Sequence, residues 1–162
     1  MKKRFLAFVF IILTVSLVAL SGCGNYGTFY SLTKAYEEGW ITYEDLLSIA
    51  YYHNGGIEGN EELMGEDYEP IAKEPLDENT ERKIRETRAY ELRNSETYPD
   101  EDATADGVKI RGYLGKYSNC YVVKCHDPGT MYPSDRVDRW FEVSGVMFHK
   151  TYHGIYVLWK EN

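Results

Sequence analysis

The stretch YSNCYVVKCHDPG, residues 117–129, places two cysteines, a histidine and an aspartate close together. These residue types can form a disulfide, bind a metal ion, or supply a nucleophile with its base. A hydrolase could use Cys125 with His126 and Asp127, or the pair His149 and His153. Which chemistry is available depends on the local structure that holds these side chains.

A continuous strand does not allow a disulfide between Cys120 and Cys125. Five residue steps separate their Cα atoms by roughly 16 Å, whereas a disulfide tolerates about 4.4 to 6.8 Å. An odd separation also directs the two side chains to opposite faces of a sheet. A bridge would require a turn within YVVK, which is a poor turn sequence, although a cysteine pair in an exported protein keeps that alternative open.

A metal site and a catalytic nucleophile each explain these residues less well than a buried strand does. Zinc ligands usually occur as four residues in closely spaced pairs, and the four histidines at 53, 126, 149 and 153 are scattered, so we expect no metal and no other cofactor. Neither cysteine lies in a recognised nucleophile signature. Free cysteines commonly behave as small buried hydrophobes, and we therefore predict that residues 119–127 form a core strand.

The elements around this strand predict an α+β fold. Residues 29–56 read as a helical hairpin, in which Thr42 with Asp45 would cap the second helix, Ile41 and Leu46 would form a hydrophobic staple, and Gly55 would end it. Residues 57–79 carry nine acidic side chains and one lysine, and they read as an acidic linker. A third helix is predicted from about Thr80 to Asn94. Four strands at 107–118, 119–127, 139–150 and 153–161 would then form an antiparallel sheet, in an order like that of cystatins, and residues 80–162 would pack with 29–56 as one domain.

The first 23 residues predict export and lipid attachment. Lys2, Lys3 and Arg4 precede the apolar run FLAFVFIILTVSLVAL, and Leu-Ser-Gly follows up to Cys23. This pattern is typical of a leader peptide over residues 1–22, and Leu-Ser-Gly-Cys resembles the bacterial lipoprotein cleavage box. The alternative is an uncleaved anchor, but the run is short for a spanning helix of about 20 residues. We expect a lipid on Cys23, a tether over 23–28, and a domain on the extracytoplasmic face of the cell membrane.

The charge of the chain excludes nucleic acid as an expected partner. Loss of the leader would leave 15 basic and 26 acidic residues, a net charge of −11. A chain this acidic is repelled as a whole by phosphate backbones and by anionic lipid or wall polymer. The expected partners are the membrane, through the lipid on Cys23, and an extracellular protein, peptide or glycan.

Aromatic residues suggest how such a partner would bind. All 15 tyrosines and all three tryptophans follow Cys23, and these side chains offer large amphipathic contact areas. An exposed aromatic face of the sheet is therefore a candidate binding surface, and its expected members are Tyr113, Tyr117, Tyr121, Trp140, Tyr156 and Trp159.

Three stretches, LTKAYEEGWITYEDLLSIAYYHN, GYLGKYSNCYVVK and IYVLWKEN, resemble a group of uncharacterised lipoproteins and secreted proteins of Gram-positive bacteria. The resemblance rests on the helical turn from Gly39 to Leu46 and on the terminal Leu158 to Lys160, and it covers most of residues 29–160. The resemblance implies an extracytoplasmic location and a helical hairpin followed by a terminal sheet, and it identifies no catalytic residue. The leading hypothesis is a lipid-anchored extracytoplasmic binding protein that is not an enzyme; the alternative is a cell-envelope hydrolase that uses Cys, His and Asp groups.

Overall fold

The computed structural model describes residues 26–93, 103–125, 139–150 and 155–161. Its elements in chain order are β1 (Tyr26–Ser31), α2 (Leu32–Glu37), α3 (Tyr43–Asn54), α4 (Glu61–Met64), α5 (Glu78–Glu86), β2 (Arg88–Arg93), β3 (Ala103–Tyr117), β4 (Cys120–Cys125), β5 (Arg139–Val143), β6 (Val146–Lys150) and β7 (Ile155–Lys160). Within the described ranges, no helix has the length and apolar character needed to cross a membrane.

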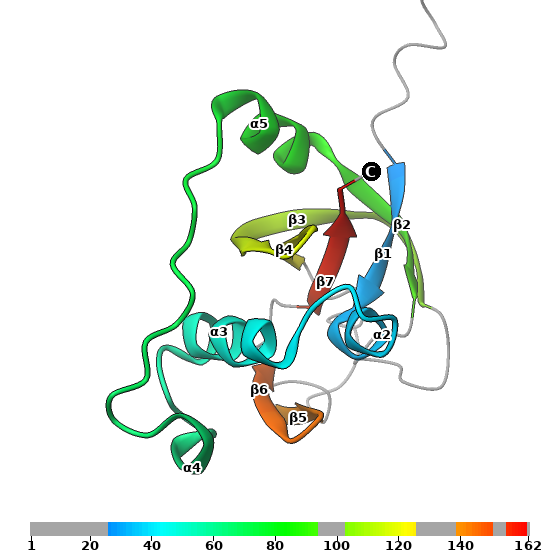
Figure 1. Cartoon of the computed structure of the whole chain (residues 1–162). Coiled ribbons are helices and arrows are strands. Elements are labelled where there is room, and N and C mark those ends of the chain that lie inside the picture. The colour runs from blue at the N-terminus through cyan, green and yellow to red at the C-terminus, as the bar shows by residue number, and fades with distance from the viewer. Residues whose placement is uncertain (1–25, 94–102, 126–138, 151–154, 162) are drawn as a thin grey trace, which may run out of the picture.

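Five strands close into a barrel in the order β1-β2-β3-β4-β7, while β5 and β6 form a separate two-stranded sheet. The strand pairs β2–β3, β3–β4, β4–β7 and β7–β1 are antiparallel, and β1 pairs with β2 in parallel. A closed ring with an odd number of strands must contain a parallel pair, because alternating directions cannot close on themselves. Parallel neighbours require a long crossover connection, and here that connection holds α2, α3, α4 and α5 (Figure 1).

The α+β class is confirmed, but the predicted four-stranded antiparallel sheet is wrong, and so is the cystatin-like comparison that depended on it. The extra strands come from two segments with other expected structures. β1 begins inside the segment expected to be a tether, and β2 occupies the end of the expected third helix. The expected single strand over 139–150 is a hairpin, β5–β6, because Ser144 and Gly145 adopt φ values of 52° and 85° and reverse the chain.

The third helix ends at Glu86, eight residues before its expected end at Asn94. The Asp77 side chain caps its start by accepting hydrogen bonds from the backbone N–H groups of Asn79 and Thr80. At the other end, Thr87 takes an extended conformation with ψ 136°, and its hydroxyl donates to the Lys83 carbonyl. The chain then enters β2, which pairs with β1 on one side and β3 on the other.

The capping prediction for α3 is confirmed. The Thr42 N–H donates to the Asp45 carboxylate at 2.8 Å, and the Asp45 N–H donates to the Thr42 hydroxyl at 3.2 Å. Gly55 ends the helix in the left-handed conformation, with φ 78°. The same Asp45 carboxylate accepts a hydrogen bond from Ser118 in the β3–β4 turn at 2.8 Å, so the cap also ties α3 to the barrel. The close packing of α2 on α3 as a hairpin stays a prediction.

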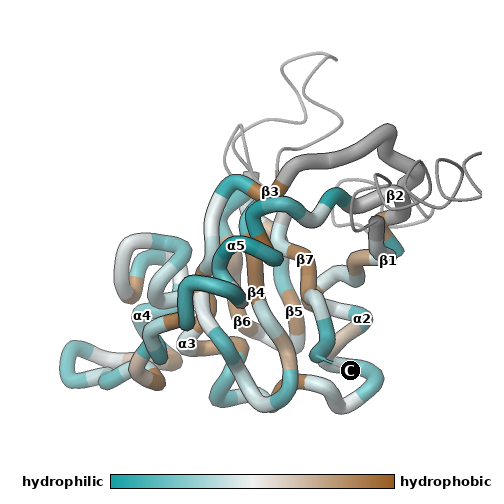
Figure 2. Tube along the Cα trace, turned by 90° about the horizontal axis from the view of Figure 1, so that it is seen from above, coloured by the Kyte–Doolittle hydropathy of each residue, from teal (hydrophilic) through white to brown (hydrophobic). Residues whose placement is uncertain are grey.

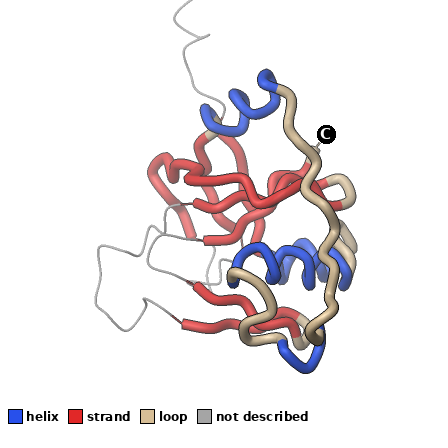
Figure 3. The backbone as a smooth tube through the Cα atoms, turned by 90° about the vertical axis from the view of Figure 1, so that its left-hand side faces the viewer, coloured by secondary structure: helices blue, strands red, loops and turns tan. Residues whose placement is uncertain are grey.

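Two apolar clusters share the strands β4 and β7. The first lies inside the barrel, where every barrel strand contributes a buried residue and α5 adds Ile84. The second lies between the outer face of β4 and β7, the helices α2 and α3, and the β5–β6 sheet. Figure 3 shows the resulting order: α5, then the barrel, then α3, then β5–β6 and α4. Burial on both faces explains why β4 reads as a nearly continuous apolar run.

Candidate functional site

Within the cysteine-containing stretch, residues Cys120–Cys125 form the buried strand β4, which agrees with the predicted core strand; the last two residues of that prediction, 126 and 127, lie outside the described residues. Cys120 and Cys125 are both buried free thiols in β4. Cys120 belongs to the outer cluster, where its Sγ lies 3.7 Å from the Trp40 carbonyl oxygen, while Cys125 belongs to the barrel interior. The two side chains thus point to opposite faces, as their odd spacing requires.

Burial raises the pKa of the Cys125 thiol and also that of Cys120. The thiolate is the reactive form of cysteine, so burial of this kind disfavours nucleophilic attack. His126, Asp127 and His153, the expected partners in a hydrolytic site, lie outside the described residues. The described part of the chain contains no group of three or more His, Cys, Asp or Glu side chains arranged to hold a metal ion.

His53 has a structural role at the junction of α3 and β6. Its Nε2–H donates to the backbone carbonyl of His149, and its Nδ1 accepts a hydrogen bond from the Tyr156 hydroxyl. Burial lowers the pKa of His53 from 6.5 to about 4, outweighing the hydrogen bond to His149, while the nearby charge of Lys124 adds to the decrease. The ring is therefore neutral at pH 7, with its proton on Nε2.

Two asparagines complete the polar contacts along β6. Asn60 accepts from the Met147 N–H at 2.7 Å and donates to the Met147 carbonyl at 2.8 Å. Asn54 accepts from the His149 N–H at 2.9 Å and donates to the Met147 carbonyl at 3.0 Å. These amides pair with the strand as a neighbouring backbone would, and this structural role accounts for the asparagines at the end of α3 and at the start of α4.

The six aromatic candidates do not share one environment. Tyr117, Tyr121 and Tyr156 are buried, with exposed fractions of 2%, 7% and 1%, Tyr113 and Trp159 are half-buried, and Trp140 is 37% exposed. Trp140 stacks on His149 with ring centroids 4.7 Å apart, and it lies so close to Gly59 that a Cβ there would come within 2.3 Å of its ring. Trp140 thus holds the loop after α3 against the β5–β6 hairpin.

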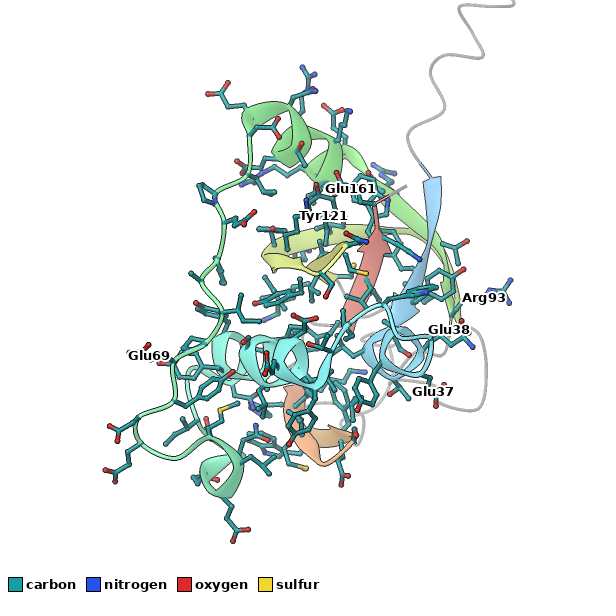
Figure 4. The ribbon with its side chains drawn as sticks, in the orientation of Figure 1. Glu37, Glu38, Glu69, Arg93, Tyr121 and Glu161 are labelled. Atoms are coloured by element: carbon teal, nitrogen blue, oxygen red, sulfur yellow. The ribbon has the colours of Figure 1, made fainter. Side chains whose placement is uncertain are left out.

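Three of these candidates do come together. Tyr121 lies between Tyr113 and Trp159, with ring centroids 6.2 Å and 5.8 Å away, and the three rings form a row across β3, β4 and β7. The Tyr121 hydroxyl donates to Glu161 at 3.1 Å, and these two residues lie side by side in Figure 4. Glu161 also pairs with Lys116 at 3.0 Å. The Tyr121 ring is thereby held in place by Glu161, and Tyr113 lies at the end of the row, where it lines the cavities beside α5.

Tyr113 lines two cavities between β3, α5 and the segment that precedes α5. The larger has a volume of about 300 Å³ and is bounded by Lys73, Glu74, Pro75, Leu76, Glu81 and Tyr113. The smaller, of about 70 Å³, continues beneath α5 and is bounded by Glu81, Ile84, Arg85, Ile110, Arg111, Gly112 and Tyr113. We call residues Lys73–Leu76 the strap, and the larger cavity the strap pocket. Its volume is at the lower end of the range for ligand sites.

The Tyr113 hydroxyl is buried, and none of the described residues hydrogen-bonds to it. Burial raises the pKa of Tyr113 to about 12, with smaller contributions from Tyr121 and Glu74. A buried polar group without a partner costs roughly 1 to 3 kcal/mol. Such a group calls for an explanation, and one explanation is another molecule, such as water, that supplies the missing hydrogen bond.

The charged side chains around the strap pocket are partly neutralised within the fold. Glu81 accepts from the guanidinium of Arg85, with an Nε to Oε1 distance of 2.8 Å. The Lys73 ammonium lies over the Tyr52 ring, 4.4 Å from its centroid. The apolar part of the wall is formed by Pro75, Leu76 and the ring of Tyr113. This combination suits a ligand with an apolar group and a hydrogen-bond acceptor.

Sequence reasoning identified Tyr113 but missed the strap and Glu81, because both belong to segments interpreted as linker and charged helix face. One signal was available: Pro75-Leu76 is an apolar pair directly before the Asp77 helix cap, within an otherwise acidic run. Leu76 packs against the cluster inside the barrel, which fixes the strap above Tyr113.

The fold and the pocket define an α+β protein with a five-stranded mixed barrel and a small cleft beside its covering helix. Comparison of the chain with protein-family models, with curated proteins and with solved structures finds no match.

Proposed function

We propose that this protein is a lipid-anchored, extracytoplasmic binding protein that captures a peptide segment in the strap pocket. An apolar side chain of the peptide fills the space against Leu76 and Pro75, and a backbone carbonyl accepts a hydrogen bond from Tyr113. The observation that carries the proposal is the buried hydroxyl of Tyr113, which has no hydrogen-bond partner among the described residues and belongs to a side chain that lines the pocket.

We favour a peptide over a glycan because of the proportion of apolar to polar groups in the pocket wall. A glycan needs several polar contacts for its hydroxyl groups, whereas Pro75, Leu76 and the ring of Tyr113 form a continuous apolar part of this wall beside the charged Lys73 and Glu74. Glu81 is already bound to Arg85, which leaves it less able to serve a sugar. Peptides supply apolar side chains and carbonyl acceptors together, and aromatic residues are frequent anchors for them.

The cellular location of the protein is part of the same proposal. The Leu-Ser-Gly-Cys23 box supports a lipidated cysteine, and the resemblance to lipoproteins and secreted proteins of Gram-positive bacteria supports the extracytoplasmic face of the membrane. We also propose that the helices within residues 29–56 pack against each other as a helical hairpin. A cell-envelope hydrolase is the weaker alternative, because the buried Cys125 thiol is unsuited to act as its nucleophile.

The test uses the soluble chain from residue 24, with tyrosines labelled by 3-fluorotyrosine, and a library of capped tripeptides that vary the central residue. We expect tripeptides with Leu, Met or Phe to shift the Tyr113 fluorine resonance. The variant Tyr113→Phe should bind them about 2- to 10-fold more weakly, which corresponds to loss of one hydrogen bond of roughly 0.5 to 1.5 kcal/mol.

The matched control is Tyr43→Phe, which removes an exposed hydroxyl on α3 and should leave binding unchanged. Tyr113→Phe should not lower the stability of the free protein, since the hydroxyl it removes has no partner in the fold. Tripeptides that leave the Tyr113 resonance unmoved while chitin or peptidoglycan oligosaccharides shift it would replace the peptide with a glycan. Equal tripeptide affinity of the two variants would contradict the role of the hydroxyl.

A further inference from the structure

A bulge in β3 brings Arg111 and Tyr113 to the same cavity. Ile110 and Gly112 pair with two consecutive residues of β4, so Arg111 is an extra residue in the strand ladder. Successive strand residues point to opposite faces, and an extra residue shifts this alternation by one. Tyr113 therefore packs against the same apolar cluster as Ile110, although an odd number of residue steps separates them. Bulges of this kind re-aim side chains and are frequent beside functional sites.

The smaller cavity has both apolar and charged walls. Ile84 and Ile110 are buried and form the apolar part, and Glu81, Arg85 and Arg111 form the charged part. α5 lies over this part of β3, and Figure 2 shows α5 as a mostly hydrophilic helix. The volume of about 70 Å³ exceeds the roughly 10 to 15 Å³ that one water molecule requires, so a small polar group such as a carboxylate fits.

The charges that line the two cavities leave one cation available. The Glu81 carboxylate accepts from Nε and Nη2 of Arg85, at 2.8 and 2.5 Å, so these two charges offset each other. Lys73 and Glu74 are adjacent in the strap and opposite in sign. Among the described residues, no carboxylate forms an ion pair with Arg111. With three basic and two acidic side chains in the walls, Arg111 is available to bind an anion.

The net negative charge of the chain opposes anion binding at longer range. Exposed charges farther away than about 8 to 10 Å are largely screened at physiological ionic strength. Asp77, Glu78 and Glu86 lie in or beside α5 but line neither cavity, and the Asp77 carboxylate is occupied in capping the helix. Direct contact of a carboxylate with Arg111 outweighs these repulsions, because the Coulomb energy falls with distance and with solvent screening.

We propose that the strap pocket and the smaller cavity together bind the C-terminal residue of a peptide, with its terminal carboxylate between Arg111 and Tyr113. This inference rests on the proposed capture of a peptide in the strap pocket, and it specifies which part of the peptide is bound. The Tyr113 hydroxyl, without a partner among the described residues, donates to one carboxylate oxygen, and the Arg111 guanidinium donates to the other.

The two cavities share the wall residues Glu81 and Tyr113, so they hold groups that are close together in the ligand. A C-terminal residue carries its carboxylate and its side chain on one Cα atom. Its apolar side chain then occupies the strap pocket against Leu76, while its carboxylate occupies the smaller cavity. An aspartate or glutamate side chain would not place an apolar group on the same residue.

The test uses the full chain in a non-ionic detergent and isothermal titration calorimetry with three peptides. The first is acetyl-Ala-Ala-Leu with a free carboxylate, the second is its C-terminal amide, and the third is acetyl-Ala-Asp-Leu-amide. We expect the acid to bind about 5- to 20-fold more tightly than its amide, which is a modest gain for a charged hydrogen bond because Arg111 is exposed.

Arg111→Gln should reduce this preference to less than about twofold and leave the affinity for the amide unchanged, because the amide makes no ionic contact with the guanidinium. The side chain is exposed and has no ion pair with the described residues, so the variant should stay folded. The matched control is Arg82→Gln, which removes the same charge from an exposed position on α5 that lines neither cavity, and it should keep the preference.

The outcomes separate this inference from the proposed function. Equal affinities for the acid and its amide would overturn recognition of the C-terminus and leave peptide capture in place. Failure of all three peptides to bind would overturn both. Tighter binding of the aspartate-containing amide than of the acid would replace the C-terminus with an acidic side chain. A preference for the acid that survives Arg111→Gln would overturn the assignment of the carboxylate to Arg111.

Discussion

Acidification should destabilise the fold through His53. In the folded protein the pKa of His53 is about 4, whereas in the unfolded chain it is near 6.5. Between these values the unfolded state binds more protons, so stability is lost as the pH falls from about 6.5 towards 4. Two and a half pKa units correspond to about 3.4 kcal/mol at full effect. At pH 5, and allowing for partial exposure of the ring, we expect a loss of about 1 to 2 kcal/mol relative to pH 7.5.

The assay is urea denaturation followed by tryptophan fluorescence at pH 7.5 and pH 5.0. Carboxylates and other histidines also titrate in this range, so the informative quantity is the difference between variants. His53→Gln retains an N–H that can reach the His149 carbonyl and does not titrate, and it should lose about 1 to 2 kcal/mol less than the wild type on acidification. Leu63→Ala, a change at an exposed residue of α4 that carries no ionisable group, should keep the wild-type loss. Equal losses for the wild type and His53→Gln would refute the assignment of this pH dependence to His53.

Three further predictions concern packing and backbone geometry. Asn60→Ala removes two hydrogen bonds to the Met147 backbone, of 2.7 and 2.8 Å, and although Asn54 still donates to the Met147 carbonyl, the Met147 N–H loses its side-chain acceptor. The change should lower the free energy of unfolding by about 1 to 3 kcal/mol in urea titrations, whereas an exposed Glu62→Ala change on α4 should have little effect. The thiols of Cys120 and Cys125 should react with a chromogenic disulfide reagent only after denaturation, and a fast native reaction would contradict their burial. Gly145→Ala forces a Cβ onto a residue with φ 85°, so it should cost about 1 to 2 kcal/mol, whereas Gly145→Asn should cost less.

Local signals in the sequence were sufficient for α3 and for β4. Thr42 and Asp45 satisfy each other's backbone N–H groups, so the start of the helix is determined by residues three apart. The spacing of Cys120 and Cys125 likewise determines their opposite directions in any continuous strand. The Ser144-Gly145 turn was also readable in principle, because Ser-Gly is a turn dipeptide, yet the apolar residues on both sides of it suggested one long strand.

The strands β1 and β2 could not be predicted in this way. The sequence RAYELR in β2 contains good helix formers directly after a helix, and its strand conformation depends on neighbours distant in the chain. β1 pairs with β2 across the whole crossover connection and with β7 near the C-terminus. β2 forms a strand despite its helix-forming residues because closure of the barrel pairs it with β1 and β3. The same closure buries Phe29 and Leu92 inside the barrel.

Closure also explains why a pocket lies beside a segment that reads as a linker. Because β1 and β2 are parallel neighbours, the end of β1 and the start of β2 lie at opposite ends of the barrel, and the connection must travel the full length of the barrel to join them. α2 and α3 lie at the end of the barrel where β1 stops, and α5 lies at the end where β2 starts (Figure 1). The strap is the last part of the chain that connects these two ends. An acidic composition allows this segment to stay in contact with water along most of its path, while Leu76 secures it to the barrel interior. The strap pocket is the space left where the return passes over Tyr113, so five-stranded closure generates both the fold and the candidate site.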